Sequence, residues 1–123
     1  MVGFGPNLYA IQGNKLYRID PSTGGRTDVS GGTAWPGPTR MVALGLNLYV
    51  IVANRLMATD FTMSSWVQIG NDSWNSVTSM TPLNSALYIV QGSALFKVLP
   101  TGANFLLGPV SNWPGDTTMA AIN

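Results

Sequence analysis

The chain has 123 residues, of which 46% are hydrophobic and only 9% are charged, and its formal net charge is +1. A chain of this length can bury a core, and its apolar content is too high for a disordered segment. Its few basic residues are scattered and form no stripe that would neutralise a run of phosphates, so nucleic acid is not an expected partner.

The sequence leaves the cellular compartment open. Cysteine is absent, which excludes disulfides and thiolate chemistry but is compatible with an extracellular or a cytoplasmic protein. The most apolar run, residues 48–53, is far shorter than the roughly 20 residues that span a bilayer. The first residues also lack the basic and apolar regions of a signal peptide. We therefore expect a soluble chain without a membrane span.

A module of about 40 residues occurs three times along the chain. Each copy opens with a methionine, a Leu-Tyr pair begins seven residues later, and a second leucine follows fifteen residues after the methionine. The opening methionines are Met1, Met41 and Met80. We assign the copies to residues 1–40, 41–79 and 80–118, and residues 119–123 repeat the opening positions of a fourth copy.

The apolar residues of each copy come in short runs bounded by Gly, Asn, Pro or Ser, which is typical of strands. In the first copy, residues 8–11 and 16–20 are joined by Gln-Gly-Asn-Lys, a turn that tolerates positive φ, so the two runs form a predicted hairpin. The other two copies repeat this hairpin. After a looser linker, a further strand is predicted at residues 26–29, 66–69 and 105–107.

Four short strands per unit of about 40 residues are typical of a β-propeller blade, so we predict an all-β fold of three such blades. In the second copy, Leu48 and Val50 point to one face of their strand, and Tyr49 and Ile51 point to the other. Apolar residues on both faces indicate a sheet packed between two neighbours. A sandwich of two sheets is the alternative.

Three blades leave an incomplete ring, because propellers need roughly four to eight. Two chains joined head to tail would give six blades without an open edge, so we expect closure by homo-oligomerisation, as a homodimer. Residues 119–123 would then compete with residues 1–5 of the partner for one innermost strand position. Either one end is displaced, or the chain is a piece of a longer array.

The residues suited to catalysis are few. Histidine, cysteine and glutamate do not occur, which excludes nucleophilic triads and histidine metal sites, and the five aspartates show no acid and base spacing. We predict no enzyme activity, no cofactor and no metal. Asp20 and Asp60 end the same strand in two copies, where a carboxylate capping the following turn is the expected role.

One tryptophan lies six residues before each of Met41, Met80 and Met119, in the loop that leads to the next blade. An indole there could cover the apolar face of a sugar while neighbouring Asn and Asp side chains bind the hydroxyls. The candidate ligand-binding residues are Trp35, Trp74, Trp113, Asn71, Asp72, Asn75, Asn112 and Asp116. Alternatively, these tryptophans only pack between adjacent blades.

The run Ile-Gly-Asn-Asp-Ser-Trp-Asn at residues 69–75, the strand from Met80, and the segments 86–88 and 94–97 resemble the repeat of tachylectin-type and tectonin-type β-propeller lectins. In that family a Gly-Gly pair precedes the loop tryptophan, whereas this chain has other residue pairs there. The resemblance implies binding of N-acetylated or methylated sugars at the tryptophan loop.

Two functions are therefore expected. The first is a multivalent carbohydrate-binding propeller built from identical chains, whose partners are glycans and itself. The second is a non-catalytic propeller scaffold or fragment that mediates only protein–protein interaction or assembly.

Overall fold

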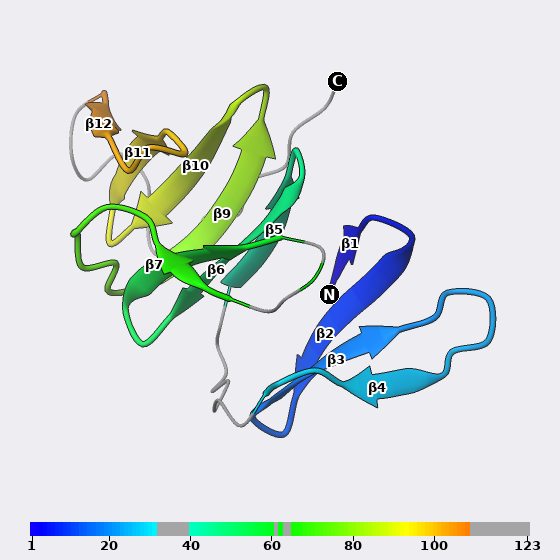
Figure 1. The fold of residues 1–123 in the computed structure, drawn as a ribbon. Helices are drawn as coiled ribbons and strands as arrows, with labels where there is room; N and C mark the ends of the chain where they lie inside the picture. The colour runs from blue at the N-terminus through cyan, green and yellow to red at the C-terminus, as the bar shows by residue number, and fades with distance from the viewer. Residues whose placement is uncertain (32–39, 61, 63–64, 109–123) are drawn as a thin grey trace.

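The computed structural model describes residues 1–31, 40–60, 62 and 65–108. These residues form three antiparallel sheets of four strands each (Figure 1). Within each sheet, strands that are consecutive in the sequence are hydrogen-bonded neighbours. The predicted all-β fold with four strands per repeat is thus confirmed.

The strand bounds follow the repeats closely. The first sheet contains β1 (Val2–Phe4), β2 (Asn7–Gln12), β3 (Lys15–Ile19) and β4 (Arg26–Asp28). The second sheet contains β5 (Arg40–Leu44), β6 (Asn47–Val52), β7 (Arg55–Thr59) and β8 (Val67–Gln68). The third sheet contains β9 (Val77–Leu83), β10 (Ala86–Gln91), β11 (Ala94–Val98) and β12 (Asn104–Leu107).

Several strand bounds differ from those expected, most of them by one residue. The strand β9 begins at Val77 rather than at Met80: Ser79 pairs with Val90, and after a register shift Val77 pairs with Gln91. The strand β8 has only two residues. The segment 119–123, predicted to start a fourth repeat, lies outside the described residues.

The hairpin turns have the backbone conformation that the sequence predicts. Gly13 and Asn14 have φ angles of 58° and 62°, and Ala53 and Asn54 have φ angles of 51° and 63°. Two consecutive residues with positive φ form the turn whose twist matches that of paired antiparallel strands. These turns fix the register of β2 on β3 and of β6 on β7.

The second sheet is packed on both faces. We call its contact with the first sheet the first seam; the buried core of this seam consists of Phe4, Tyr9, Leu16, Leu48 and Val50. We call its contact with the third sheet the second seam; the buried core there consists of Val42, Tyr49, Ile51, Leu56, Ala58, Trp74, Met80, Leu87, Ile89 and Val98. Alternate residues of β6 enter different seams, since side chains alternate along a strand.

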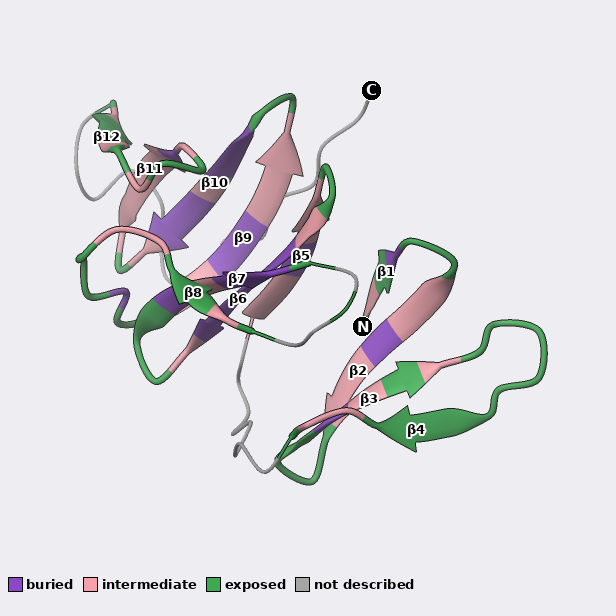
Figure 2. Cartoon of the chain, in the orientation of Figure 1, coloured by how far each residue is buried: buried purple, intermediate pink, exposed green. Residues whose placement is uncertain are grey.

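This arrangement confirms the prediction of a sheet between two neighbours and differs from a two-sheet sandwich. Figure 2 shows the buried residues along the strands that face the seams. Each fully buried leucine or valine stabilises the fold by about 1.5–3 kcal/mol relative to an exposed one. The innermost strand β5 lies beside both β1 and β9, so the three sheets are arranged around their first strands (Figure 1).

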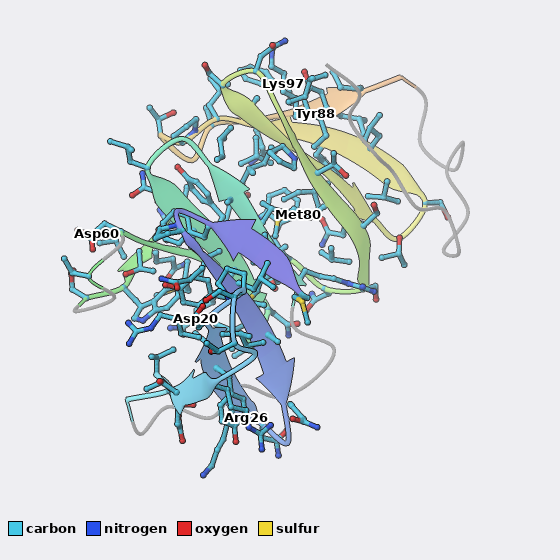
Figure 3. All side chains as sticks on the ribbon, turned by 90° about the vertical axis from the view of Figure 1, so that its right-hand side faces the viewer. Asp20, Arg26, Asp60, Met80, Tyr88 and Lys97 are labelled. Atoms are coloured by element: carbon cyan, nitrogen blue, oxygen red, sulfur yellow. The ribbon has the colours of Figure 1, made fainter. Side chains whose placement is uncertain are left out.

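The two end sheets each have an outward face. On the first sheet, register and burial place Leu8, Ala10, Tyr17 and Ile19 on the face opposite to the first seam, and all four are half-buried. On the third sheet, the outward face includes Tyr88 and Lys97, which are paired across strands. Figure 3 shows Tyr88 and Lys97 at one end of the stack and Arg26 of the first sheet at the other.

Candidate functional site

The connection from β8 to β9, residues 69–76, crosses from the second sheet to the third and contains four of the predicted site residues. Two adjacent residues anchor it to both sheets. The backbone N–H of Trp74 donates to the carbonyl oxygen of Asn54 at 2.8 Å, in the β6–β7 turn. On the other side, Gln91 Nε2 donates to the carbonyl oxygen of Ser73 at 3.0 Å.

Trp74 is part of the core. Its side chain is 3% exposed and meets the ring of Phe96 edge to face, with ring centroids 5.6 Å apart and an interplanar angle of 84°. An indole in this position presents no free face to a sugar. At this loop the geometry therefore favours the predicted packing role over the predicted ligand-binding role.

The connection also approaches the β11–β12 loop very closely. A Cβ atom added at Gly102, whose φ is 97°, would lie 2.7 Å from the Cα atom of Gly70. Nearby, Asn104 Nδ2 donates to Asp72 Oδ2 at 2.7 Å. The backbone approach and this hydrogen bond hold the loop of the third sheet against the end of the second sheet.

A polar depression of about 390 Å³ lies between the β6–β7 turn and this connection. It is lined by Ala53, Asn54, Arg55, Gln68, Asn71, Asp72 and Ser73. The fold thus brings the predicted residues Asn71 and Asp72 together, whereas Asn75 is exposed and does not line the depression.

Sequence reasoning missed the other five members of this depression: Ala53, Asn54, Arg55, Gln68 and Ser73. The signal was present in the turn, because Asn54-Arg55 repeats the Asn14-Lys15 pair of the first copy. The other predicted site residues, Trp35, Trp113, Asn112 and Asp116, lie outside the described residues.

A second cavity, of about 290 Å³, lies at the edge of the second seam. It is lined by Asn47, Tyr49, Ala58, Thr59, Asp60, Ser65, Val67, Ile69 and Pro100. All of these residues belong to the second sheet and its loops except Pro100, which follows β11 of the third sheet. The segment that follows β11 of the third sheet therefore lies near β7 of the second sheet.

Asp20 and Asp60, which directly follow β3 and β7, cap the next turns, as predicted. Asp20 Oδ1 accepts hydrogen bonds from the backbone N–H and the hydroxyl of Ser22 at 2.8 and 2.7 Å. Asp60 Oδ1 accepts the same pair from Thr62 at 2.9 and 2.6 Å. The bonds from Ser22 hold the pKa of the Asp20 carboxyl below its ordinary value of 3.8.

Asp28 shows the same effect, because the backbone N–H and the hydroxyl of Ser30 lower the pKa of its carboxyl. Among the described residues, no group of three or more His, Cys, Asp or Glu side chains could hold a metal ion. The same residues contain no helix long and apolar enough to cross a membrane.

No protein-family model and no curated protein matches the chain. Several solved structures are similar to the chain. A chain of the S. cerevisiae structure of a Dbp5 variant bound to Nup159, a Gle1 variant, IP6 and ADP has a TM-score of 0.52 and 20% identity, over 85% of this chain and 28% of that chain. The crystal structure of the N-terminal domain of Nup159 has the same TM-score and identity, over 86% of this chain and 28% of that chain.

At this identity the likeness shows the fold alone, and that fold is a β-propeller. The chain spans less than a third of the length of either of these two chains.

Replacing Trp74 by alanine should destabilise the fold, since it empties the space between the second and third sheets. We expect a loss of about 3–5 kcal/mol in the free energy of unfolding, measured by urea denaturation. The neighbouring exposed residue provides the control: Asn75→Ala should change stability by no more than about 0.5 kcal/mol. A Trp74→Ala protein as stable as the wild type would contradict the packing role.

The capping hydrogen bonds predict a pH effect. A carboxyl whose pKa is lowered by folding stabilises the fold above its unfolded pKa, and this contribution is lost as the pH falls through the folded pKa. NMR titration should give an Asp20 pKa below 3.8, and Ser22→Ala should raise it while leaving that of Asp28 unchanged. An Asp20 pKa that Ser22→Ala does not alter would show that these bonds are not the cause.

Proposed function

We propose that the chain is a non-catalytic β-propeller unit that assembles with a second copy of itself and acts as a scaffold for protein interaction. One observation carries the proposal: the outward faces of the end sheets repeat the residue pattern of the faces that are buried in the two seams. Such faces are interaction surfaces when their apolar area is large.

One part of this residue pattern is on the face that each sheet turns toward the following sheet. Tyr9 and Tyr49 occupy the same repeat position and are 2% and 3% exposed, because each packs against the following sheet. Tyr88 occupies this position in the third sheet and is only half-buried. Further along the same sheet, Phe105 is 51% exposed. A following sheet would bury both rings.

The other part of this residue pattern is on the face that each sheet turns toward the preceding sheet. Leu48 and Leu87 share one repeat position and are completely buried in the seams. Leu8 has this position in the first sheet and is half-buried on the outward face. Polar groups on that face are paired with one another: the guanidinium of Arg26 lies 4.6 Å from the ring centroid of Tyr17 and donates to Gln12 at 2.6 Å.

A second copy is the occupant that fits both faces. The outward face of its first sheet, which includes Leu8, would pack on the outward face of this chain's third sheet, which includes Tyr88. In the same way, the outward face of its third sheet would pack on the first sheet of this chain. Two chains would then form a ring of six sheets with a twofold axis, within the usual size range of propellers. The seams inside the chain provide the template for this contact.

The scaffold role has support from two sides. In one of the similar structures, a Dbp5 variant is bound to Nup159 and a Gle1 variant. The chain itself has no histidine, cysteine or glutamate, and the aspartates that directly follow β3 and β7 serve as turn caps. A ring that presents loops on a rigid body is a common platform for binding other proteins.

Glycan binding is a second candidate, and the polar depression around Asn71 and Asp72 favours it. The depression offers amide, carboxylate and guanidinium groups to sugar hydroxyls. Without an exposed indole at this loop, recognition would rest on hydrogen bonds. If the depression binds glycans, a glycan array should show binding that Asn71→Ala abolishes and Asn75→Ala preserves. An array without signal would contradict glycan binding.

The mass of the chain in solution tests the assembly. Native mass spectrometry or light scattering at micromolar concentration should give about twice the 13.1 kDa of one chain. Tyr88→Arg should give the monomer mass, because it places a charge without a partner in the proposed contact.

The matched control is Leu46→Arg, a change in the β5–β6 turn at a side chain that is already 73% exposed. This variant should remain dimeric. A wild-type protein of 13.1 kDa, with circular dichroism typical of β-sheets, would refute the proposed assembly.

A further inference from the structure

We infer that the polar depression between the β6–β7 turn and the β8–β9 connection binds a carboxylate of a protein partner, and that Arg55 is the residue that holds it. This inference rests on the proposed scaffold role, since it names the chemistry of the partner and the place where the partner binds. It is derived from one pair of positions that can be compared in all three repeats, and from the groups that surround Arg55.

In the first sheet a base and an acid meet at this pair of positions. Lys15 Nζ lies 3.5 Å from Asp28 Oδ2, and both side chains are exposed. Asp28 of β4 pairs with Tyr17 of β3, and Lys15 lies two residues before Tyr17, so Lys15 and Asp28 are on the same face of the sheet. The first repeat thus supplies its own counterion.

The second sheet has the base but not the acid. Arg55 begins the third strand of this sheet, as Lys15 does in the first. Gln68 takes the position of Asp28, since each pairs with the residue two positions after the base. A glutamine amide can accept a hydrogen bond but carries no charge. Among the described residues Arg55 has no ion pair, so its charge is available to a ligand.

The third repeat has apolar residues at both positions. Ala94 begins β11, and Leu106 of β12 pairs with the residue two positions after Ala94. A base therefore accompanies an acid in the first repeat, and an apolar residue accompanies an apolar residue in the third. Of the three repeats, only the second has a charged side chain whose counterpart is uncharged. Such a site can take its counterion from a partner.

The fold surrounds Arg55 with further hydrogen-bond donors. Asn54 and Gln68 line the depression from the second sheet, and Asn71 and Ser73 line it from the β8–β9 connection. All of these side chains are exposed. A guanidinium can donate two parallel hydrogen bonds to one carboxylate, and the amide and hydroxyl groups can donate to it as well. Because hydrogen bonds join the connection to both neighbouring sheets, these donors are held in place before a ligand binds.

Asp72 limits the charge of the ligand. It also lines the depression, and its Oδ2 accepts a hydrogen bond from Asn104 Nδ2 at 2.7 Å. An anion at Arg55 is therefore repelled by a carboxylate nearby, and the repulsion grows with the charge of the anion. A single carboxylate fits this balance better than a phosphate or a run of acidic residues.

The lining of the depression favours a peptide over a sugar. None of the described residues that line it is aromatic, so a sugar ring would find no flat apolar surface there. A peptide carboxylate needs only the guanidinium and the neighbouring donors. This carboxylate can belong to a Glu or Asp side chain or to the end of a chain, since the same groups bind both.

NMR titration of the ¹⁵N-labelled full chain tests the inference with defined peptides. The probes are acetyl-Ser-Gly-Glu-Gly-Ser-amide, the same peptide with Gln in place of Glu, and the Gln peptide with a free terminal carboxylate. One or both of the carboxylate peptides should cause saturable shifts of the backbone amide signals of residues 54–55 and 71–73, and the neutral peptide should cause none. Added salt should weaken the binding.

Two variants should each weaken the binding of the carboxylate peptide by about tenfold. Arg55→Gln removes the charge that holds the carboxylate. Gln68→Asp introduces the acid that the first sheet has at this position, so Arg55 gains a partner within the chain. The matched control is Lys15→Gln, which removes the corresponding base of the first sheet, away from the depression, and should leave the peptide affinity unchanged.

Asp72→Asn should have the opposite effect. The variant keeps an oxygen that can accept from Asn104 but removes the like charge, so it should strengthen the binding by about threefold. The dispersion of the NMR signals shows in the same experiment whether each variant is folded.

The remaining outcomes would overturn the inference. If neither carboxylate peptide shifts these signals, or if folded Arg55→Gln binds like the wild type, the depression is not a carboxylate site. If glucuronate shifts the signals and the peptides do not, the ligand is an acidic sugar. The mass of the chain in solution is a separate result: a dimer that binds no peptide would keep the proposed assembly without this site, and a monomer that binds through Arg55 would keep the site without the assembly.

Discussion

The apolar contact between the faces of neighbouring sheets is the interaction on which this molecule depends. A sheet of four strands that are two to seven residues long has little stability of its own. The second sheet becomes stable because Leu48 and Val50 are buried on one side of it and Tyr49 and Ile51 on the other. The same need for a neighbour on each face applies to the end sheets, and it is the physical basis of the proposed assembly.

The connection between the second and third sheets shows how closely packing and a possible site are related. The indole of Trp74 is buried in the second seam, and the backbone N–H of Trp74 donates to the carbonyl oxygen of Asn54 in the β6–β7 turn. Asn71, Asp72 and Ser73 of that loop are exposed and line the depression with Arg55. Any ligand bound there would contact a rigid surface, since the loop is anchored to both sheets.

The sequence by itself determined the repeats, the hairpins with their turns, the short strands and the two apolar faces of β6, because all of these follow from local patterns and from alternation along a strand. It also determined the capping role of Asp20 and Asp60, which involves only residues two positions away. Only the tertiary structure decided that Trp74 is buried against Phe96 and that Asn71 and Asp72 join Asn54 and Arg55. The exposure of an indole and the members of a depression depend on which distant segments pack together, and no local pattern contains that information.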